Sequence, residues 1–438
     1  MKRIVLNELV AWKNKDAALR KPLILEGARQ VGKTWLAREL GGQAFAGEYI
    51  EVNFEDNENL RTLFEADFDM DRILMAIQSA TGKHVVPGKT LLFFDEIQHA
   101  HRGLLALKYF YDKLPHLHII AAGSLLGVMD HKDDSFPVGK VDFLRVSPMG
   151  FEEFLMALGK DGLVDILHSL DSVSINAFSA QFEDLLRQYY FVGGMPEVVK
   201  TYVEQRDYAA VRKVQKAILT SYEKDFSKHP PKELIPRMTL LWNSIPAQLA
   251  KENKKFVYSA VKSGARAREY EAAITWLCNA GLIYKVTRVR AGELPLRAFE
   301  DMDAFKLYVL DIGLHGAMSG LSARTLITGN DFFKQYKGAL TEQFVLQELQ
   351  LISDVFIHYW TPDVGTSEVD FVLQLEDEVV PIEVKAEQNL HAKSLRRFID
   401  EYNPIHTIRT SMAPMSSDKR VIDLPLYAFS QLQHLIIK

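Results

Sequence analysis

Five short apolar runs in the first third of the chain alternate with segments of helical periodicity. Short, nearly continuous apolar runs between loops are typical of strands buried on both faces of a sheet. Strands that alternate with helices favour a parallel sheet covered by helices on both faces. The pattern predicts a doubly wound α/β fold, with strands at 22–25, 49–52, 90–94, 118–122 and 143–146.

The middle third has mostly helical spacing of its apolar residues. Gly193, Gly194 and Pro196 form its strongest break, because glycine and proline interrupt regular structure. Apolar positions recur three and four residues apart, which predicts helices at 151–168, 209–222 and 238–249. The next residues predict the order helix, helix, strand, at 256–261, 267–279 and 281–286. That order resembles a winged helix-turn-helix.

The last third predicts a second α/β domain. An amphipathic helix is expected at 337–349. Two strands with alternating apolar and polar residues, 368–373 and 380–385, are expected to form a hairpin. A further helix at 394–401 and a final strand at 426–429 would complete this terminal sheet.

Length and composition indicate several soluble domains. A chain of 438 residues exceeds what one core usually serves, and we expect domains at 1–150, 151–300 and 301–438. The net charge of −5 gives no global basic excess, so nucleic acid would need a local patch. The single Cys278 excludes an intramolecular disulfide and a Cys-cluster zinc site. Without an apolar segment of spanning length, we expect a cytoplasmic protein and no membrane partner.

A glycine-containing loop joins the first strand to the next helix. Its sequence is Gly27, Ala28, Arg29, Gln30, Val31, Gly32, Lys33 and Thr34. Glycines let successive N–H groups turn inward around phosphate oxygens, and the helix adds its positive N-terminal end. The loop therefore predicts an ATP site, with Lys33 on the β and γ phosphates and the Thr34 hydroxyl on Mg²⁺. The alternative is a chance match in a glycine-containing turn.

The apolar run at 90–94 ends in two carboxylates, Asp95 and Glu96. Parallel strands end at one edge of a sheet, so both carboxylates would reach the phosphate loop. We expect Asp95 to hold the Mg²⁺ hydration shell and Glu96 to polarise the attacking water; a solvated strand end is the alternative. The run at 118–122 is expected as an extra strand between the other two. Ser124 after it is either a γ-phosphate sensor or a helix N-cap.

Basic residues gather in one stretch of the middle third. Residues 254–290 hold eight of them against the acidic Glu269 and Glu271: Lys254, Lys255, Lys262, Arg266, Arg268, Lys285, Arg288 and Arg290. A basic patch on a helix-turn-helix is a surface that binds double-stranded DNA. The alternative is an ordinary solvated helix surface, or a module that packs against other domains.

The predicted C-terminal hairpin carries Asp370 on one strand, and Glu383 and Lys385 on the next. Side chains alternate across a strand, so Glu383 and Lys385 point to one face. Two carboxylates and an ammonium can hold Mg²⁺ and stabilise a water that attacks a phosphodiester. Glu342 on the preceding helix would supply one more carboxylate. The alternative is the exposed face of a half-buried hairpin.

These motifs together resemble prokaryotic AAA-type ATPases that carry a C-terminal domain of uncharacterised function. The resemblance spans about residues 20 to 435 and rests on segments 29–34, 94–98, 191–197, 306–314, 368–370 and 382–385. It implies an ATPase core, a winged-helix-like middle, and a terminal domain similar to the PD-(D/E)XK nuclease fold, also called restriction-endonuclease-like. It gives Lys33, Thr34, Asp95 and Glu96 the ATP and Mg²⁺ roles, and it matches Glu342, Asp370, Glu383 and Lys385 to the nuclease motif.

One position departs from the pattern of these relatives. They usually show Gly-Arg before the fifth strand, where this chain has Gly139 and Lys140. Lysine cannot make the bidentate phosphate contact of an arginine finger, and Arg145 is the nearest substitute. AAA-type relatives often form rings, which makes a homo-oligomer one expectation. Two functions stay open: a DNA-associated ATPase with nuclease activity, or a nucleotide-controlled switch whose C-terminal domain is a catalytically idle protein-binding module.

Overall fold

A computed structural model describes residues 1–123, 137, 139–226, 230–251, 254–328, 334–386, 392–418 and 420–436. The chain divides into two compact units. The first comprises Arg3–Ser147 with Asn279–Gly281. The second comprises Met1–Lys2, Pro148–Cys278 and Leu282–Lys438.

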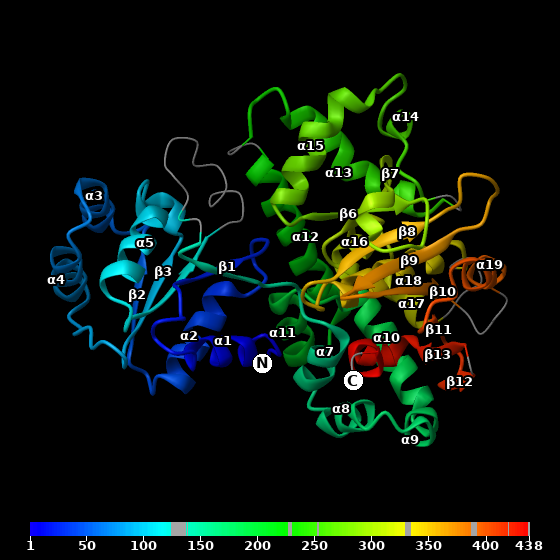
Figure 1. Cartoon of the computed structure of the whole chain (residues 1–438), viewed down its shortest axis with the longest axis horizontal. Coiled ribbons are helices and arrows are strands. Elements are labelled where there is room, and N and C mark those ends of the chain that lie inside the picture. The colour runs from blue at the N-terminus through cyan, green and yellow to red at the C-terminus, as the bar shows by residue number, and fades with distance from the viewer. Residues whose placement is uncertain are drawn as a thin grey trace. The chain divides into compact units, whose positions relative to one another are not determined.

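The first unit is built on a five-stranded sheet in the order β2-β3-β4-β1-β5. Every neighbouring pair is parallel. The strands, drawn in blue to cyan in Figure 1, are β1 (Leu23–Glu26), β2 (Tyr49–Asn53), β3 (Leu91–Asp95), β4 (His118–Ala122) and β5 (Asp142–Arg145). The five predicted strands are therefore confirmed, and so is the insertion of the 118–122 strand between the other two.

Helices lie on both sides of this sheet (Figure 1). They are α1 (Leu6–Lys13), α2 (Lys33–Ala44), α3 (Glu58–Ala66), α4 (Met70–Thr81), η1 (Ile97–His99) and α5 (Gly103–Lys113). Phe54, Phe64, Phe94 and Phe110 are buried together on the face covered by α3, α4 and α5. Phe64 and Phe94 meet edge to face with their centroids 5.7 Å apart, a favourable geometry for aromatic pairs. This packing fixes β3, which ends in Asp95 and leads directly to Glu96.

The second unit begins with a helical region. Its helices are α7 (Phe151–Ala157), α8 (Asp161–His168), α9 (Ser172–Ala177), α10 (Ser179–Val192), α11 (Pro196–Gln205), α12 (Tyr208–Phe226), α13 (Ile235–Leu249), α14 (Tyr258–Val261) and α15 (Ala267–Asn279). The single helix predicted at 151–168 is two helices, because Gly159 takes a φ of +71° between them. The predicted break at Gly193 separates α10 from α11.

An eight-stranded mixed sheet follows, in the order β12-β13-β11-β10-β9-β8-β6-β7. Its strands are β6 (Ile283–Val289), β7 (Glu300–Val309), β8 (Phe356–Trp360), β9 (Val369–Leu375), β10 (Glu378–Val384), β11 (Ile408–Ser411), β12 (Ser416–Asp418) and β13 (Val421–Pro425). The strand predicted as part of a winged helix is β6, which pairs with β7 and in parallel with β8. The sheet thus includes strands from both sides of residue 300, and the winged-helix assignment stays a prediction.

Further helices accompany this sheet: η2 (Leu296–Phe299), α16 (Ile312–Met318), α17 (Ala323–Thr328), α18 (Lys334–Leu349), α19 (Lys393–Tyr402), η4 (Leu426–Gln431) and α20 (Leu432–Ile436). The predicted final strand at 426–429 is wrong, because these residues begin the 3₁₀ helix η4. All four are buried, so the apolar run marks burial and not extension. The more polar β11 and β13 complete the sheet instead.

Candidate functional sites

The glycine-containing loop between β1 and α2 takes the conformation of a phosphate cradle. Gly27, Gln30 and Gly32 all have positive φ, at +148°, +67° and +98°. A Cβ on Gly27 would lie 2.3 Å from the carbonyl oxygen of Val146, so the loop accepts only glycine there. Helix α2 starts directly after Gly32, at Lys33. The loop therefore presents backbone N–H groups and a helix N-terminus to one place.

The side chain of Lys33 contacts the backbone of the phosphate loop. Its Nζ donates to the carbonyl oxygens of Gly27 and Ala28, at 2.9 and 2.8 Å. Burial lowers the pKa of Lys33 to about 8, while the nearby carboxylates of Glu96 and Asp95 oppose that shift. Polar contacts to neutral carbonyls are weaker than those to phosphate oxygens. An arriving triphosphate would therefore draw this ammonium out of the loop.

Thr34 and Asp95 form the pair that a magnesium ion would share. Thr34 Oγ1 donates to Asp95 Oδ2 at 3.1 Å. This hydrogen bond connects the start of α2 with the end of β3. Burial raises the pKa of Asp95 to about 6, although the hydrogen bond from Thr34 acts in the opposite direction. A hydroxyl and a carboxylate beside a phosphate loop are the protein ligands that Mg²⁺ uses with nucleotides. The residues present therefore fit the ion.

Glu96 follows Asp95 in the left-handed backbone region, with a φ of +49°. Its carboxylate accepts a hydrogen bond from the Gln98 side-chain amide. Gln98 lies in the segment 94–98, but the sequence assigns it no role because no spacing rule points to it. Ser124, the predicted γ-phosphate sensor, lies outside the described residues.

Arg3 also belongs to this site, and sequence reasoning missed it. It is buried, and its guanidinium donates to the carbonyl oxygens of Val31 at 3.0 Å and Ser147 at 2.8 Å. The Arg3 side chain therefore connects the phosphate loop, through Val31, to the residues after β5, through Ser147. Its position far from the loop in the sequence left no local signal. Lys140, the departure from the arginine pattern, forms a 2.7 Å ion pair with Asp112.

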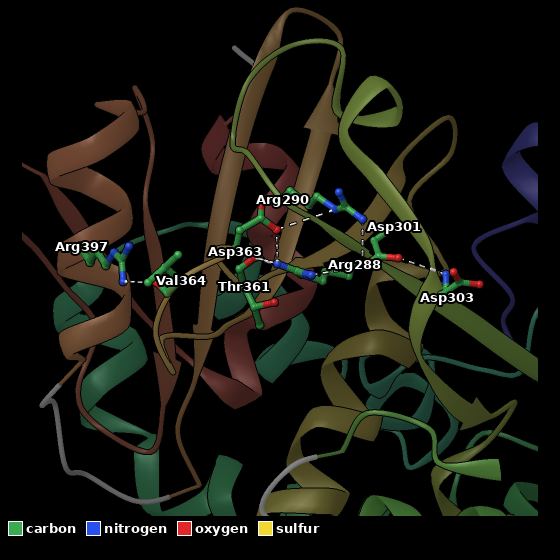
Figure 2. A network of polar contacts seen from close by, with 8 residues as sticks. All are labelled: Arg288, Arg290, Asp301, Asp303, Thr361, Asp363, Val364 and Arg397. Carbon is green, nitrogen blue, oxygen red and sulfur yellow. Dashed lines mark hydrogen bonds and ion pairs between the residues drawn. The ribbon is translucent and has the colours of Figure 1, made fainter.

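Two members of the predicted basic surface lie in an ion-pair network instead. Figure 2 shows Arg288 between Asp301 and Asp363, to which it donates at 3.1 and 3.0 Å. Arg288 also donates through Nε and Nη2 to the carbonyl oxygen of Thr361, at 3.1 and 2.9 Å. Arg290 reaches the same two carboxylates at 3.6 and 3.8 Å. These two arginines join the β6–β7 hairpin to the residues after β8.

Of the other six basic residues, two contact other side chains of the second unit and four are exposed. Lys254 pairs with the buried Glu342, and Lys285 lies over the ring of Phe305, 4.3 Å from its centroid. The exposed remainder lies around α14 and the start of α15: Lys255, Lys262, Arg266 and Arg268. The exposed part of the predicted basic surface is thus smaller than the sequence predicted.

The four residues of the predicted nuclease-type site come together in the second unit. Glu342 lies on α18, Asp370 on β9, and Glu383 on β10. Lys385 Nζ lies 2.6 Å from Glu383 Oε1, and Asp370 Oδ2 accepts the N–H of Val384 at 2.8 Å. Burial, then the neighbouring Glu342 and Glu383, raise the pKa of Asp370 well above its ordinary value. We call these four residues, with Glu368, the carboxylate cluster.

Two more ammonium groups enter this cluster. Burial alone would raise the pKa of Glu342, but Lys254 and Lys306 outweigh it and hold that pKa at about 2. Lys306 on β7 is fully buried, and its Nζ lies 2.6 Å from Glu368 Oε1 and 3.8 Å from Glu342 Oε2. In the described part of the chain, no three His, Cys, Asp or Glu side chains are grouped to hold a metal ion.

Comparison with protein families places the first unit. Residues 19–155 match the model of the AAA domain. This segment is similar to AAA domains. It contains the glycine loop, Asp95 and Glu96. Residues 183–325 and 337–428 match two domains of unknown function, DUF8612 and DUF4143, and neither description names an activity.

Solved structures give weaker likenesses. A Walker-type ATPase of Pyrococcus abyssi is 16% identical, with a TM-score of 0.44, over 72% of this chain and 95% of that chain. The RuvB Holliday junction branch migration motor of Thermotoga maritima is 13% identical, with a TM-score of 0.30, over 68% and 91%. AMPPCP-bound DnaA from Aquifex aeolicus is 13% identical, with a TM-score of 0.29, over 62% and 85%. With TM-scores this low, the AAA assignment depends on the domain match.

A search of curated proteins found no match to the chain. Among the helices of the described residues, none combines the length and the apolar character needed to cross a bilayer.

Proposed function

We propose that this protein hydrolyses ATP with Mg²⁺ and couples that hydrolysis to work on double-stranded DNA. The observation that carries the ATPase half is the contact between Thr34 and Asp95 beside the phosphate loop. A hydroxyl from the loop helix and a carboxylate from a different strand meet at 3.1 Å, which a chance glycine turn would not produce. Glu96 lies one residue further along the chain.

In this proposal each residue has one task. The loop N–H groups and Lys33 bind the phosphates, and Thr34 and Asp95 hold Mg²⁺, which neutralises charge on the β and γ phosphates. Glu96 accepts a proton from the attacking water, with its carboxylate oriented by Gln98. Ser124 is proposed as the γ-phosphate sensor. ATP turnover that is lost in Lys33→Ala and in Glu96→Gln would support this assignment.

The DNA half rests on the exposed cations around α14 and α15: Lys255, Lys262, Arg266 and Arg268. Lysine and arginine contacts to phosphates release counterions, so DNA binding through them weakens steeply with salt. The test is ATP turnover with and without duplex DNA over a range of salt concentrations. Stimulation that fades with salt supports the proposal, and an unchanged rate at every salt concentration contradicts it.

The second candidate is a nucleotide-controlled switch with a catalytically idle C-terminal domain. Its support is that Glu342, Glu368 and Glu383 each already lie against a lysine ammonium. A nicking assay on supercoiled plasmid with Mg²⁺ or Mn²⁺ tests whether the C-terminal domain of the first candidate also cuts DNA. Under the nuclease hypothesis Lys385→Ala abolishes nicking and leaves ATP hydrolysis intact. Under the switch hypothesis the wild-type chain does not nick.

A further inference from the structure

We infer that Lys306, together with Lys254, takes the place of a divalent cation in the carboxylate cluster. The side chain of Lys306 is fully buried on β7, and its Nζ lies against Glu368 and Glu342 at 2.6 and 3.8 Å. A buried ammonium is stable only when carboxylates or other acceptors replace its lost hydration. Here the acceptors include a carboxylate that a nuclease-type site would use for metal.

The surroundings of Lys306 are shaped for an ammonium. Besides the two carboxylates, its Nζ lies 4.8 Å from the centroid of the Tyr359 ring, a cation–π contact. Tyr308, two residues further along β7, donates its hydroxyl to Glu342 Oε2 at 3.2 Å. Ammonium and phenol thus approach the same carboxylate oxygen. A hard divalent ion would have to displace both contacts to bind it.

The remaining contacts leave little negative charge for a metal. Glu342 also pairs with Lys254, Glu383 pairs with Lys385 at 2.6 Å, and Asp370 accepts the Val384 N–H at 2.8 Å. Of the four carboxyl groups in the cluster, Glu342, Glu368 and Glu383 therefore each lie against a lysine ammonium. A divalent cation added here would meet two ammonium groups close to Glu342, and like charges at that distance repel strongly in a buried site. The cluster does not fit Mg²⁺ as it stands.

One acceptor in the cluster stays open. Glu383 is buried, and its Oε2 has no hydrogen-bond partner among the described residues. Removing the charge of Lys306 would leave Glu368 without its ammonium partner, and Glu342 would keep only Lys254 among the described ammonium groups. The wild-type cluster is therefore metal-free, and loss of the Lys306 charge creates affinity for a divalent cation. Neither property depends on ATP hydrolysis or on DNA binding.

The first experiment uses the nucleotide-free full chain with Asp95→Asn, so that the ATP site contributes no metal binding. Mn²⁺ is titrated and followed by electron paramagnetic resonance, with and without the added change Asp370→Asn. We expect the two proteins to bind Mn²⁺ alike and only weakly. One Mn²⁺ per chain at micromolar concentration, lost in Asp370→Asn, would overturn the inference.

The second experiment tests whether removal of the Lys306 charge creates a Mn²⁺ site. Lys306→Met keeps an unbranched side chain that lacks the terminal ammonium. We expect this variant to bind one Mn²⁺ per chain at least about tenfold more tightly and to gain thermal stability with Mn²⁺. Lys285→Met is the matched control, because its ammonium lies over the Phe305 ring. A folded Lys306→Met chain that gains no Mn²⁺ contradicts the inference. If that variant does not fold, the first experiment still decides.

Discussion

Lys33 has to leave one set of partners to take another. Its ammonium holds two loop carbonyls in the structure, whereas in the proposed complex it binds phosphate oxygens. Lys33→Ala removes that charge, so we expect ATP affinity to fall by about 10- to 100-fold, the equivalent of roughly 1.4–2.7 kcal/mol. Isothermal titration calorimetry with Mg²⁺ and ATP measures it. Wild-type affinity in this variant would mean that Lys33 does not contact the phosphates.

Glu96 is proposed to act on the water and not on the nucleotide itself. Glu96→Gln keeps the shape and a hydrogen-bonding partner for Gln98 but removes the basic carboxylate. We expect ATP binding to persist and turnover to fall by about 10²- to 10⁴-fold, a typical contribution of a general base. Single-turnover kinetics and a binding assay measure the two effects separately. Unchanged turnover would assign the base to another residue.

Asp95 gives the nucleotide site a pH dependence. Burial raises its pKa from 3.8 to about 6, and only the ionised carboxylate attracts Mg²⁺. The Mg²⁺-dependent part of ATP affinity should therefore decline as the pH falls through about 6. Titrations of ATP with and without Mg²⁺ at pH 5 and pH 7.5 measure the decline. The Asp95→Asn variant should show no such difference between the two pH values.

At the scale of elements, helix α18 carries a buried acid that works against stability. Glu348 accepts the Phe151 N–H at 2.8 Å, and burial, aided by Glu152 and Glu153, raises its pKa to about 8. The folded state keeps a proton that the unfolded chain releases above its ordinary pKa of 4.5. The free energy of unfolding therefore falls as the pH rises from 4.5 through 8.

Glu348→Gln supplies a neutral group of the same shape at every pH. We expect it to stabilise the protein at pH 8.5 by roughly 1–3 kcal/mol, with the gain shrinking toward pH 5. Thermal unfolding at both pH values measures the difference. Glu204→Gln on α11, at an exposed position, is the control and should change little. A gain that is equal at both pH values would contradict the proposed protonation.

The elements that the sequence predicts well are those whose signal is local. In the first unit, β1, β3 and β4 are buried nearly throughout, so their apolar runs are continuous and easy to place. The run at 426–429 looks the same but is a buried 3₁₀ helix after Pro425, because burial alone does not choose between extended and helical backbone. Conversely, β11 contains Arg409 and Thr410 and offers no apolar run.

The two candidate sites also differ in how much of each a local sequence signal predicts. The phosphate loop, Asp95 and Glu96 are contiguous motifs whose spacing fixes their chemistry, and the structure brings Thr34 and Asp95 together. Arg3, Lys254 and Lys306 reach their partners from distant parts of the sequence. Only the tertiary arrangement of β7, α18, β9 and β10 brings these ammonium and carboxylate groups into contact. Pattern reasoning on one sequence has no access to such pairings.

At the scale of the whole molecule, the proposed function requires that DNA bound to the exposed cations changes the rate of ATP turnover. Lys262→Ala with Arg266→Ala removes two exposed cations near α14 and α15, and we expect it to reduce DNA stimulation of ATP turnover and to flatten its salt dependence by up to about two units of slope. Lys213→Ala with Lys216→Ala on α12 removes the same charge from another exposed surface. Equal effects of the two double variants would argue against a specific DNA surface.

The place of β4 between β1 and β3 has a consequence for where the phosphoryl group goes. Neighbouring strands lie about 4.8 Å apart, so the loop strand and the strand that leads to Glu96 are separated by roughly 10 Å. In the proposed ATP complex, that width leaves room for a water molecule between the γ-phosphoryl group and the Glu96 carboxylate. We therefore expect phosphoryl transfer to water and no phosphorylated protein.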